Sequence, residues 1–331
     1  MNLLFPRQHY ACLQCGKSCG DWRIWVEPQA IEGLRRHPLA LELKVRNETF
    51  LESTSDGWHH LVHDAQGRCH FLQGDQLCGL HATSGWLAKP RACRQFPFFL
   101  IQTPDGIQVG LSFRCTAVLQ DHGRDWGDHQ AELQQLVETG SYAKVGFRPA
   151  QLGNFALDWT TYKNWEASWI ASIERGDSLA QAVYDHLAPA LGLFLDSLTW
   201  ASLLQHLGRT AVAFLEGEGP VDLQQIGQAL QSGQAFLGKQ RGWLQPHLQP
   251  VQHDPLLQRY LIHALERKSL WLGDWLGRLL MLLVAQYLVE FYAPPLGWEK
   301  AVELVEGEWR AHRDDLAEVE QGFAQTLLQF T

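Results

Sequence analysis

Cysteine is missing from most of this chain. The 331 residues include seven cysteines, and none of them follows residue 115. The C-terminal part therefore has neither thiol ligands nor disulfide bonds. Cysteines used only as small buried side chains would be scattered, whereas thiols that bind a metal must be brought together by the fold. Their clustering predicts a metal site, with the candidate ligands Cys12, Cys15, Cys19, Cys69, Cys78, Cys93 and Cys115.

A secretory leader is also missing. The first ten residues contain only a short apolar patch, residues 3–5, which Pro6 and Arg7 interrupt. A disulfide framework needs an oxidising compartment, and an odd count of seven cysteines would leave one thiol unpaired. We therefore expect a cytoplasmic protein with reduced, metal-bound cysteines.

Long apolar runs and excess positive charge are absent as well. Residues 271–292 are the most apolar stretch, but Asp274, Arg278 and Glu290 interrupt it, so we expect a buried helix and no membrane span. Residues 121–331 carry 15 basic and 26 acidic side chains. This part is not expected to bind nucleic acid.

Motifs for a particular reaction are not visible. The one glycine-rich candidate for a cofactor loop, residues 213–219, is followed by Pro220 between helical segments and is interpreted as a plain loop. The first three cysteines are spaced by two and then three residues, the reverse of the order in radical S-adenosylmethionine enzymes. Cys93 has basic neighbours that would suit a nucleophile, but a thiol within a ligand pattern is better explained as a metal ligand. Whether the protein is an enzyme stays open.

Residues 1–120 have a short-period, turn-rich pattern. Pro28 opens a predicted helix that runs to Arg36. Residues 98–103 and 107–113 predict a β-hairpin around Pro104-Asp105-Gly106, with Cys115 just beyond its second strand. A smaller hairpin, with residues 73–75 as its turn, would bring Cys69 and Cys78 side by side.

From residue 121 the pattern becomes helical, for example at Leu191, Phe194, Leu195 and Leu198. Breaks at residues 217–220, 246–255 and 294–295 predict a bundle of about six to eight helices. We interpret its tryptophans as core packing. The predicted fold class is thus α+β: a cysteine-rich metal-binding domain, residues 1–120, followed by an all-α domain, residues 121–331.

The spacing of the cysteines predicts a metal but does not identify it. Gly16 and Gly20 allow the chain to wrap closely around the first three thiols. Four thiolates suit zinc and an iron–sulfur cluster equally well. His81 is a candidate eighth ligand, and Arg91 and Arg94 could offset the charge of thiolates beside Cys93. Ordinary packing or surface roles are expected for the other nearby histidines, His59, His60, His63 and His70.

Several motifs together resemble the YkgJ-type cysteine-cluster family. They are residues 10–19 (YACLQCGKSC), 69–72 (CHFL), 78–82 (CGLHA), 89–98 (KPRACRQFPF) and 112–115 (SFRC). The resemblance covers roughly residues 8–120 and implies a domain that chelates zinc or iron. Two positions depart from the family pattern. Ser18 stands where the family has the first cysteine of an adjacent pair, and Thr116 stands where a proline commonly follows the last cysteine. The first departure removes one candidate ligand.

The sequence leads to one main interpretation and two alternatives. The main one is a cytoplasmic metal-binding protein, with Cys12, Cys15, Cys19 and Cys93 as the principal ligands of an iron–sulfur cluster or zinc. Cys69, Cys78 and Cys115 would complete that centre or form a second one, and the helical part would bind a protein partner or substrate. The chain also has a diffuse resemblance to flagellin lysine N-methylases, which implies S-adenosylmethionine and a protein substrate. The second alternative is a zinc-stabilised structural interaction protein, and no pattern predicts the oligomeric state.

Overall fold

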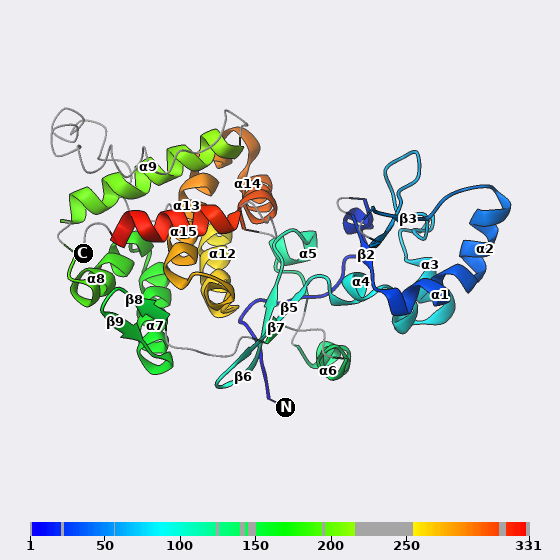
Figure 1. Ribbon diagram of the computed structural model, residues 1–331, viewed down its shortest axis with the longest axis horizontal. Coiled ribbons are helices and arrows are strands. Elements are labelled where there is room, and N and C mark those ends of the chain that lie inside the picture. The colour runs from blue at the N-terminus through cyan, green and yellow to red at the C-terminus, as the bar shows by residue number, and fades with distance from the viewer. Residues whose placement is uncertain are drawn as a thin grey trace. The chain divides into compact units, whose positions relative to one another are not determined.

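The computed structural model describes residues 2–20, 23–55, 57–123, 126–139, 143–144, 150–193, 196–215, 254–310 and 316–328 (Figure 1). The chain forms two compact units that alternate along the sequence. The cysteine unit comprises residues 9–100 and 114–142, and the helical unit comprises residues 1–8, 101–113 and 143–331. All seven cysteines belong to the cysteine unit.

A small antiparallel sheet and several short helices make up the cysteine unit. Its strands lie in the order β2-β4-β3, with β2 at Trp25–Val26, β3 at Leu51–Ser53 and β4 at His59–Leu61. The short helices and turns are η1 (Lys17–Cys19), α1 (Pro28–Arg36), α2 (Pro38–Val45), α3 (Gly79–Ser84), η2 (Trp86–Ala88), α4 (Arg91–Gln95), α5 (Thr116–Leu119), η3 (Trp126–His129) and α6 (Gln130–Glu138). Pro28 and Pro38 each begin a helix, because proline has no amide hydrogen to lose at the first helical position. His37 joins these two helices, and its ring nitrogen accepts a hydrogen bond from the amide of Leu39.

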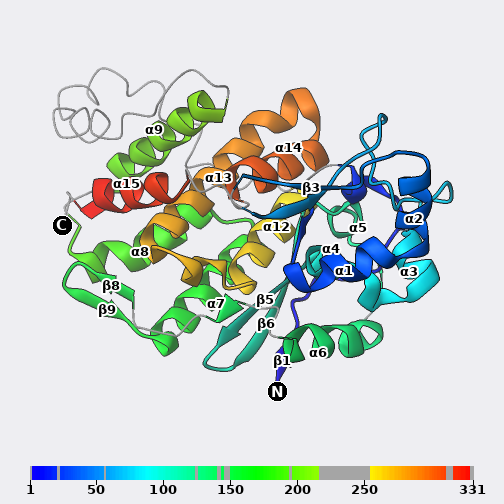
Figure 2. The same ribbon diagram turned by 45° about the vertical axis from the view of Figure 1, so that its right-hand side comes forward.

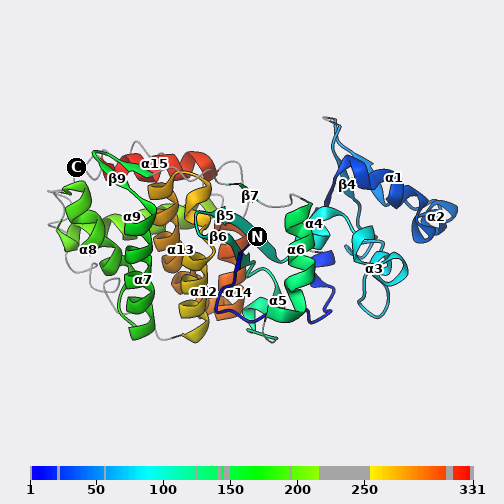
Figure 3. The ribbon, with the colours of Figure 1, turned by 90° about the horizontal axis from the view of Figure 1, so that it is seen from below.

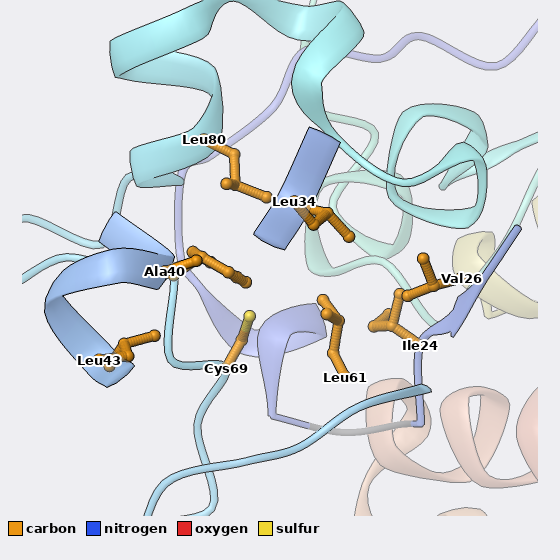
Figure 4. Close-up of a cluster of buried hydrophobic side chains, with 9 residues drawn as sticks. Ile24, Val26, Leu34, Ala40, Leu43, Leu61, Cys69 and Leu80 are labelled. Carbon is orange, nitrogen blue, oxygen red and sulfur yellow. The ribbon is translucent and has the colours of Figure 1, made fainter. Parts of the chain in front are cut away.

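One hydrophobic cluster holds these elements together (Figure 4). Leu34 of α1 and Leu43 of α2 meet Val26 and Leu61 of the sheet. Cys69 directs its sulfur into the middle of the cluster (Figure 4). The remaining buried members are Ile24, Ala40, Phe71 and Leu80.

A second sheet belongs largely to the helical unit, with strand order β1-β6-β5-β7. β5 (Phe98–Thr103) and β6 (Gly106–Leu111) form the hairpin, and β1 (Leu3–Leu4) lies parallel to β6 (Figure 2). β7 (Ala143–Lys144) lies parallel to β5. The predicted hairpin is therefore confirmed, and its turn lies at Pro104 and Asp105, because Gly106 already belongs to β6. A separate two-stranded sheet pairs β8 (Ala150–Leu152) with β9 (Phe155–Leu157).

Helices form the rest of the helical unit (Figure 3). Those that the structure describes are α7 (Trp159–Arg175), α8 (Leu179–Leu191), α9 (Ser197–Leu215), α12 (Pro255–Glu266), η5 (Ser269–Leu272), α13 (Trp275–Leu296), α14 (Trp298–Leu304), η6 (Val305–Arg310) and α15 (Leu316–Leu328). Asp158, Ser178, Asp254 and Asp274 cap α7, α8, α12 and α13 through side-chain oxygens that accept hydrogen bonds from first-turn amides. The predicted class, an α+β part followed by a helical part, is confirmed. The predicted domain boundary at residue 120 stays a prediction. It divides the chain into two continuous segments, whereas each compact unit combines separate stretches of the chain.

The long apolar helix α13 is the central element of this unit. It contacts α9, α12, α14 and α15. By length and composition alone it could cross a membrane, and 56% of its most apolar window is buried inside the unit. Its neighbours on several sides give it the contacts of a core helix, as its interrupted sequence predicts.

Several tryptophans in the described part of the helical unit pack as expected. Trp169 and Trp200 are fully buried, and Trp275 is 4% exposed. Trp159 and Trp271 contact each other and the ring of Tyr162. Phe194, Leu195, the glycine-rich loop from residue 216 and the break at residues 246–253 lie outside the described residues.

Candidate metal centre

The first cysteine motif forms a loop that ends in the short helix η1. The Cys12 sulfur accepts a hydrogen bond from the amide of Gln14 at 3.3 Å. Gly16 has φ of 68°, a left-handed conformation that favours glycine. A methyl group at Gly16 would lie 2.4 Å from the side-chain oxygen of Gln76. The loop is therefore folded closely against the turn that precedes Cys78.

The backbone connects the end of this loop to the second cysteine block. The amide of Cys69 donates a 2.8 Å hydrogen bond to the carbonyl of Cys19. Cys78 pairs with Leu72 in an isolated bridge, and Gln73 donates to Leu77 across the turn. The predicted turn is present, but the bridge pairs Cys78 with Leu72, and Cys69 is bridged to His63 instead. Leu72, the partner of Cys78, lies three residues after Cys69. Cys69 and Cys78 are therefore close, but they are not paired directly opposite each other.

Four thiols meet on the hydrophobic cluster of the cysteine unit. Cys69 is buried within it, and Cys19, Cys78 and Cys93 pack against it as half-buried residues. Cys93 comes from α4, and the other three come from η1, the bridge region and the residue before α3. We refer to Cys19, Cys69, Cys78 and Cys93 as the four-thiol set.

Electrostatics also link the members of the four-thiol set. The pKa of Cys69 is raised to about 12, mainly by burial, with a smaller contribution from negative charge on Cys19 and Cys78. Burial raises the pKa of Cys93, as would negative charge on Cys69, Cys78 and Cys19. The ammonium of Lys89 opposes this, and it lowers the pKa of both Cys93 and Cys19. Cys19, Cys69 and Cys93 therefore keep their protons at neutral pH, and the thiols of the set lie close enough together to affect one another's ionisation.

The other three cysteines gather at a second place in the same unit. Ala11 and His122 form two hydrogen bonds, from the Ala11 amide to the His122 carbonyl at 2.6 Å and between the His122 ring and the Ala11 carbonyl at 3.1 Å. This pairing brings the residues around Cys12 beside the turn after α5, the helix that Cys115 caps. We refer to Cys12, Cys15 and Cys115 as the three-thiol set.

The three-thiol set is more exposed than the four-thiol set. Cys12 and Cys15 are exposed, whereas Cys115 is buried. Burial raises the pKa of Cys115 to about 11, and negative charge on Cys12 and Cys15 adds to the effect. Burial also raises the pKa of the Tyr10 hydroxyl, as do the charges of Cys115 and Cys12 and a hydrogen bond with Cys12. The Tyr10 ring packs edge-on against Phe98, which fixes it beside the thiols.

The thiols do not form a ready-made site for a single ion. Among the residues that the structure describes, no three cysteine, histidine, aspartate or glutamate side chains stand close enough together to hold a metal ion. The four-thiol set still fits a metal in its chemistry, since it offers four soft donors in a largely buried, apolar place with Lys89 nearby. Zinc and iron–sulfur clusters both accept four thiolates.

The other candidates from the sequence have varied surroundings. His81 is exposed on α3, and its role as a ligand stays a prediction. His60 and His70 pair with Glu52 and Glu48, at 3.7 Å and 3.4 Å, in keeping with packing roles.

Glu27 organises the region around Cys93. Its carboxylate accepts hydrogen bonds from the amide of Arg91 at 3.0 Å and from the guanidinium of Arg94 at 3.3 Å. Arg94 also lies over the ring of Trp86. Lys89 is the cation that lowers the pKa of Cys93 and Cys19, and the sequence pattern did not identify it. Lys89 stands two residues before Arg91 in the sequence. The positive charge of this segment near Cys93 was therefore the signal that could have identified it.

The fold and the gathering of its thiols in two sets define a cysteine-rich α+β domain. Residues 11–118 match the family model CxxCxxCC, described as "Putative zinc- or iron-chelating domain". This part of the chain is thus a domain of the cysteine-cluster family, as the motifs indicated. No curated protein and no solved structure matches the chain significantly.

Proposed function

We propose that the cysteine unit binds an iron–sulfur cluster through the four-thiol set, and that this metal centre is the functional core of the protein. The observation that carries the proposal is the convergence of Cys19, Cys69, Cys78 and Cys93 on one hydrophobic cluster from four separate places in the sequence. Metal binding would hold together four segments that have little regular secondary structure, and its binding energy would stabilise the fold. A bound cluster would also supply one-electron chemistry.

A cluster and a single zinc ion need different spacings of their four sulfurs. A zinc ion holds its sulfurs about 2.3 Å away and draws all four together, whereas a cluster of several irons is larger and spaces its thiolates more widely. The four thiols affect one another's charge, yet no three of the described donors stand at single-ion spacing. Zinc remains the alternative, because four thiolates are also its preferred closed set.

The three-thiol set supports a second, more open site. Tyr10, whose hydroxyl interacts with Cys12, borders this set. A second site of this kind would be easier to load and to lose than the first, because Cys12 and Cys15 are exposed.

Two further functions rest on the sequence alone. A protein lysine methylase activity with S-adenosylmethionine derives from a diffuse resemblance, and the described residues add no observation in its favour. A structural interaction protein would use the metal only for folding. Thiolate ligation is compatible with both, and with the expected cytoplasmic location.

Anaerobic purification followed by analysis of iron, acid-labile sulfide and zinc tests the proposal. We expect a brown protein that absorbs broadly in the visible range and contains iron and sulfide in similar amounts. Stoichiometric zinc in a colourless protein would replace the cluster with the zinc alternative. Protein that contains neither metal after anaerobic preparation and reconstitution would refute metal binding altogether.

A further inference from the structure

A cavity of about 350 Å³ lies within the helical unit, between α7, the end of α12 and the first residues of the chain. This volume is in the range of pockets that bind small ligands. Every lining residue belongs to the helical unit, so the cavity is separate from the cysteines. Its lining residues from α7 are Lys163, Glu166, Ala167, Ile170, Ala171 and Glu174.

The pattern along α7 explains why space is left there. Residues three and four apart share one face of a helix, and the lining residues of α7 follow this spacing. Ala167 and Ala171 stand in the middle of that face with side chains too short to fill it, and Ile170 adds an apolar wall. Glu174 lies at one end of the face. The cavity therefore has a short apolar middle and an acidic end.

The buried ion pair in the wall is saturated. Both oxygens of Glu166 are engaged in short contacts, one with the hydroxyl of Tyr162 and the other with the ammonium of Lys268. Lys268 has φ of 59°, a left-handed conformation that costs a non-glycine residue about 1 kcal/mol or more. Both oxygens of Glu166 are thus occupied, and the charge of Lys268 also lowers the pKa of Glu266.

At the acidic end of the cavity, unlike at the buried pair of Glu166 and Lys268, the cation that pairs with the carboxylates has an exposed side chain. This cation is Arg7. Glu266, at the end of α12, has a side chain that is 15% exposed, and Glu174 faces it from α7. Arg7 reaches both: its Nη1 contacts Glu174, and its Nε lies 3.3 Å from Glu266 Oε1. The pair of Arg7 with Glu174 is exposed on both sides and contributes only about 0 to 1 kcal/mol, whereas its pair with Glu266 has a largely buried carboxylate. The Arg7 side chain is therefore displaced from Glu266 only by a ligand that brings its own cation to this carboxylate.

Burial of Glu266 makes a replacement cation favourable. Its pKa is raised by burial, because the ionised carboxyl has lost much of its water. A cation that enters the cavity would restore part of that stabilisation, and its aliphatic part could lie over Ala167 and Ala171.

We propose that this cavity binds a small ligand whose guanidinium or primary ammonium group sits between Glu174 and Glu266, in the place that Arg7 holds when the cavity is empty. The ligand class is a basic amino acid or the basic side chain of a peptide, both of which carry a cation on a short aliphatic stem. Arg7 acts as a tethered competitor. The inference does not depend on the metal centre.

Calorimetric titration of the full-length protein with L-arginine tests the proposal. L-Citrulline, which has nearly the same shape but no charge, is the matched control ligand. A capped peptide, acetyl-Gly-Arg-Gly-amide, distinguishes a peptide side chain from a free amino acid. We expect binding of arginine, of the capped peptide or of both, and at least tenfold weaker binding of citrulline.

Three variants separate the site from general effects on folding. Arg7→Ala removes the competitor and should tighten ligand binding roughly two- to five-fold. Glu266→Gln should weaken it at least tenfold, and Glu174→Gln, at a position with a half-exposed side chain, should weaken it without unfolding the protein. Glu299→Gln on the exposed face of α14 is the control and should have no effect. Equal affinity for citrulline, no binding to either wild type or Arg7→Ala up to millimolar ligand, or weaker binding by Arg7→Ala would overturn the proposal.

Discussion

The amide of Cys69 donates a 2.8 Å hydrogen bond to the carbonyl of Cys19. This single bond joins two cysteines that are fifty positions apart, and it does so through the backbone, without any metal. The first motif contributes to two neighbouring sets: the charge of Cys19 acts on Cys69, and the charges of Cys12 and Cys15 act on Cys115 as well as on Cys19. Five predictions follow from these two sets and from the separate core of the helical unit.

Gly16→Ala should destabilise the cysteine unit and weaken metal binding. Residue 16 has φ of 68°, and a side chain there would be strained and would displace Gln76. We expect a loss of about 1 to 2 kcal/mol in the free energy of unfolding. Gly74→Ala is the matched control, because a methyl group at Gly74 meets nothing within 4 Å. Urea denaturation of both variants measures the effect, and equal stability of the two would contradict the account of the loop.

The stability of the metal-free protein should fall at alkaline pH. Burial raises the pKa of Cys69 from an ordinary value of 9.0 to about 12, and that of Cys115 to about 11. The folded state thus holds these protons more tightly than the unfolded chain does. The resulting stabilisation is fully present below about pH 9 and is lost as pH rises towards 11 or 12.

Denaturant titrations at pH 8 and pH 10.5 measure this loss. The metal-loaded protein is the control, since its thiolates must already be deprotonated and its metal affinity should rise with pH. A metal-free protein that is equally stable at both pH values would show that the thiols are not buried as described.

Glu27→Ala should loosen α4 and the position of Cys93. The carboxylate accepts hydrogen bonds from the Arg91 amide and the Arg94 guanidinium, and bonds of this charged kind contribute about 1.5 to 3 kcal/mol each. Allowing for water that replaces the carboxylate, we expect a net loss of about 1 to 2 kcal/mol. Glu32→Ala, on the exposed face of α1, should change stability little. Thermal unfolding and the rate of metal loss to a chelator are the readouts, and unchanged values in Glu27→Ala would argue against this role.

Glu306→Ala should destabilise the helical unit strongly without removing the metal. Glu306 is 1% exposed and forms a 2.6 Å ion pair with the buried guanidinium of Arg267. Removing one partner of a buried pair costs about 3 to 5 kcal/mol, because the other charge stays buried. The exposed Glu308→Ala is the neighbouring control. Unfolding curves and metal analysis of the same samples test the prediction, which fails if the variant loses its metal while still folded.

Local signals in the sequence predicted much of the fold. Pro28 and the apolar spacing of Ile31 and Leu34 indicated α1, and Pro104-Asp105-Gly106 indicated the hairpin turn. The change to helical periodicity indicated the bundle, and the clustering of cysteines indicated the metal-binding domain. Each of these depends on residues close together in the chain.

The grouping of the cysteines could not be predicted in the same way. Spacing suggested that Cys12, Cys15 and Cys19 act together, because Gly16 marked a possible turn without showing in which direction the chain leaves it. The pairing of Ala11 with His122 spans more than a hundred residues and leaves no local signal. The same holds for Arg7, whose partners Glu174 and Glu266 come from distant helices.

The metal content of two matched triple variants tests the central claim most directly. Cys12→Ser/Cys15→Ser/Cys115→Ser removes the three-thiol set, and Cys19→Ser/Cys69→Ser/Cys78→Ser removes most of the four-thiol set. After identical anaerobic purification, the first variant should keep one stoichiometric metal centre, and the second should have lost it. Retention of that centre by the second variant, with loss from the first, would contradict the assignment of the buried site to Cys19, Cys69, Cys78 and Cys93.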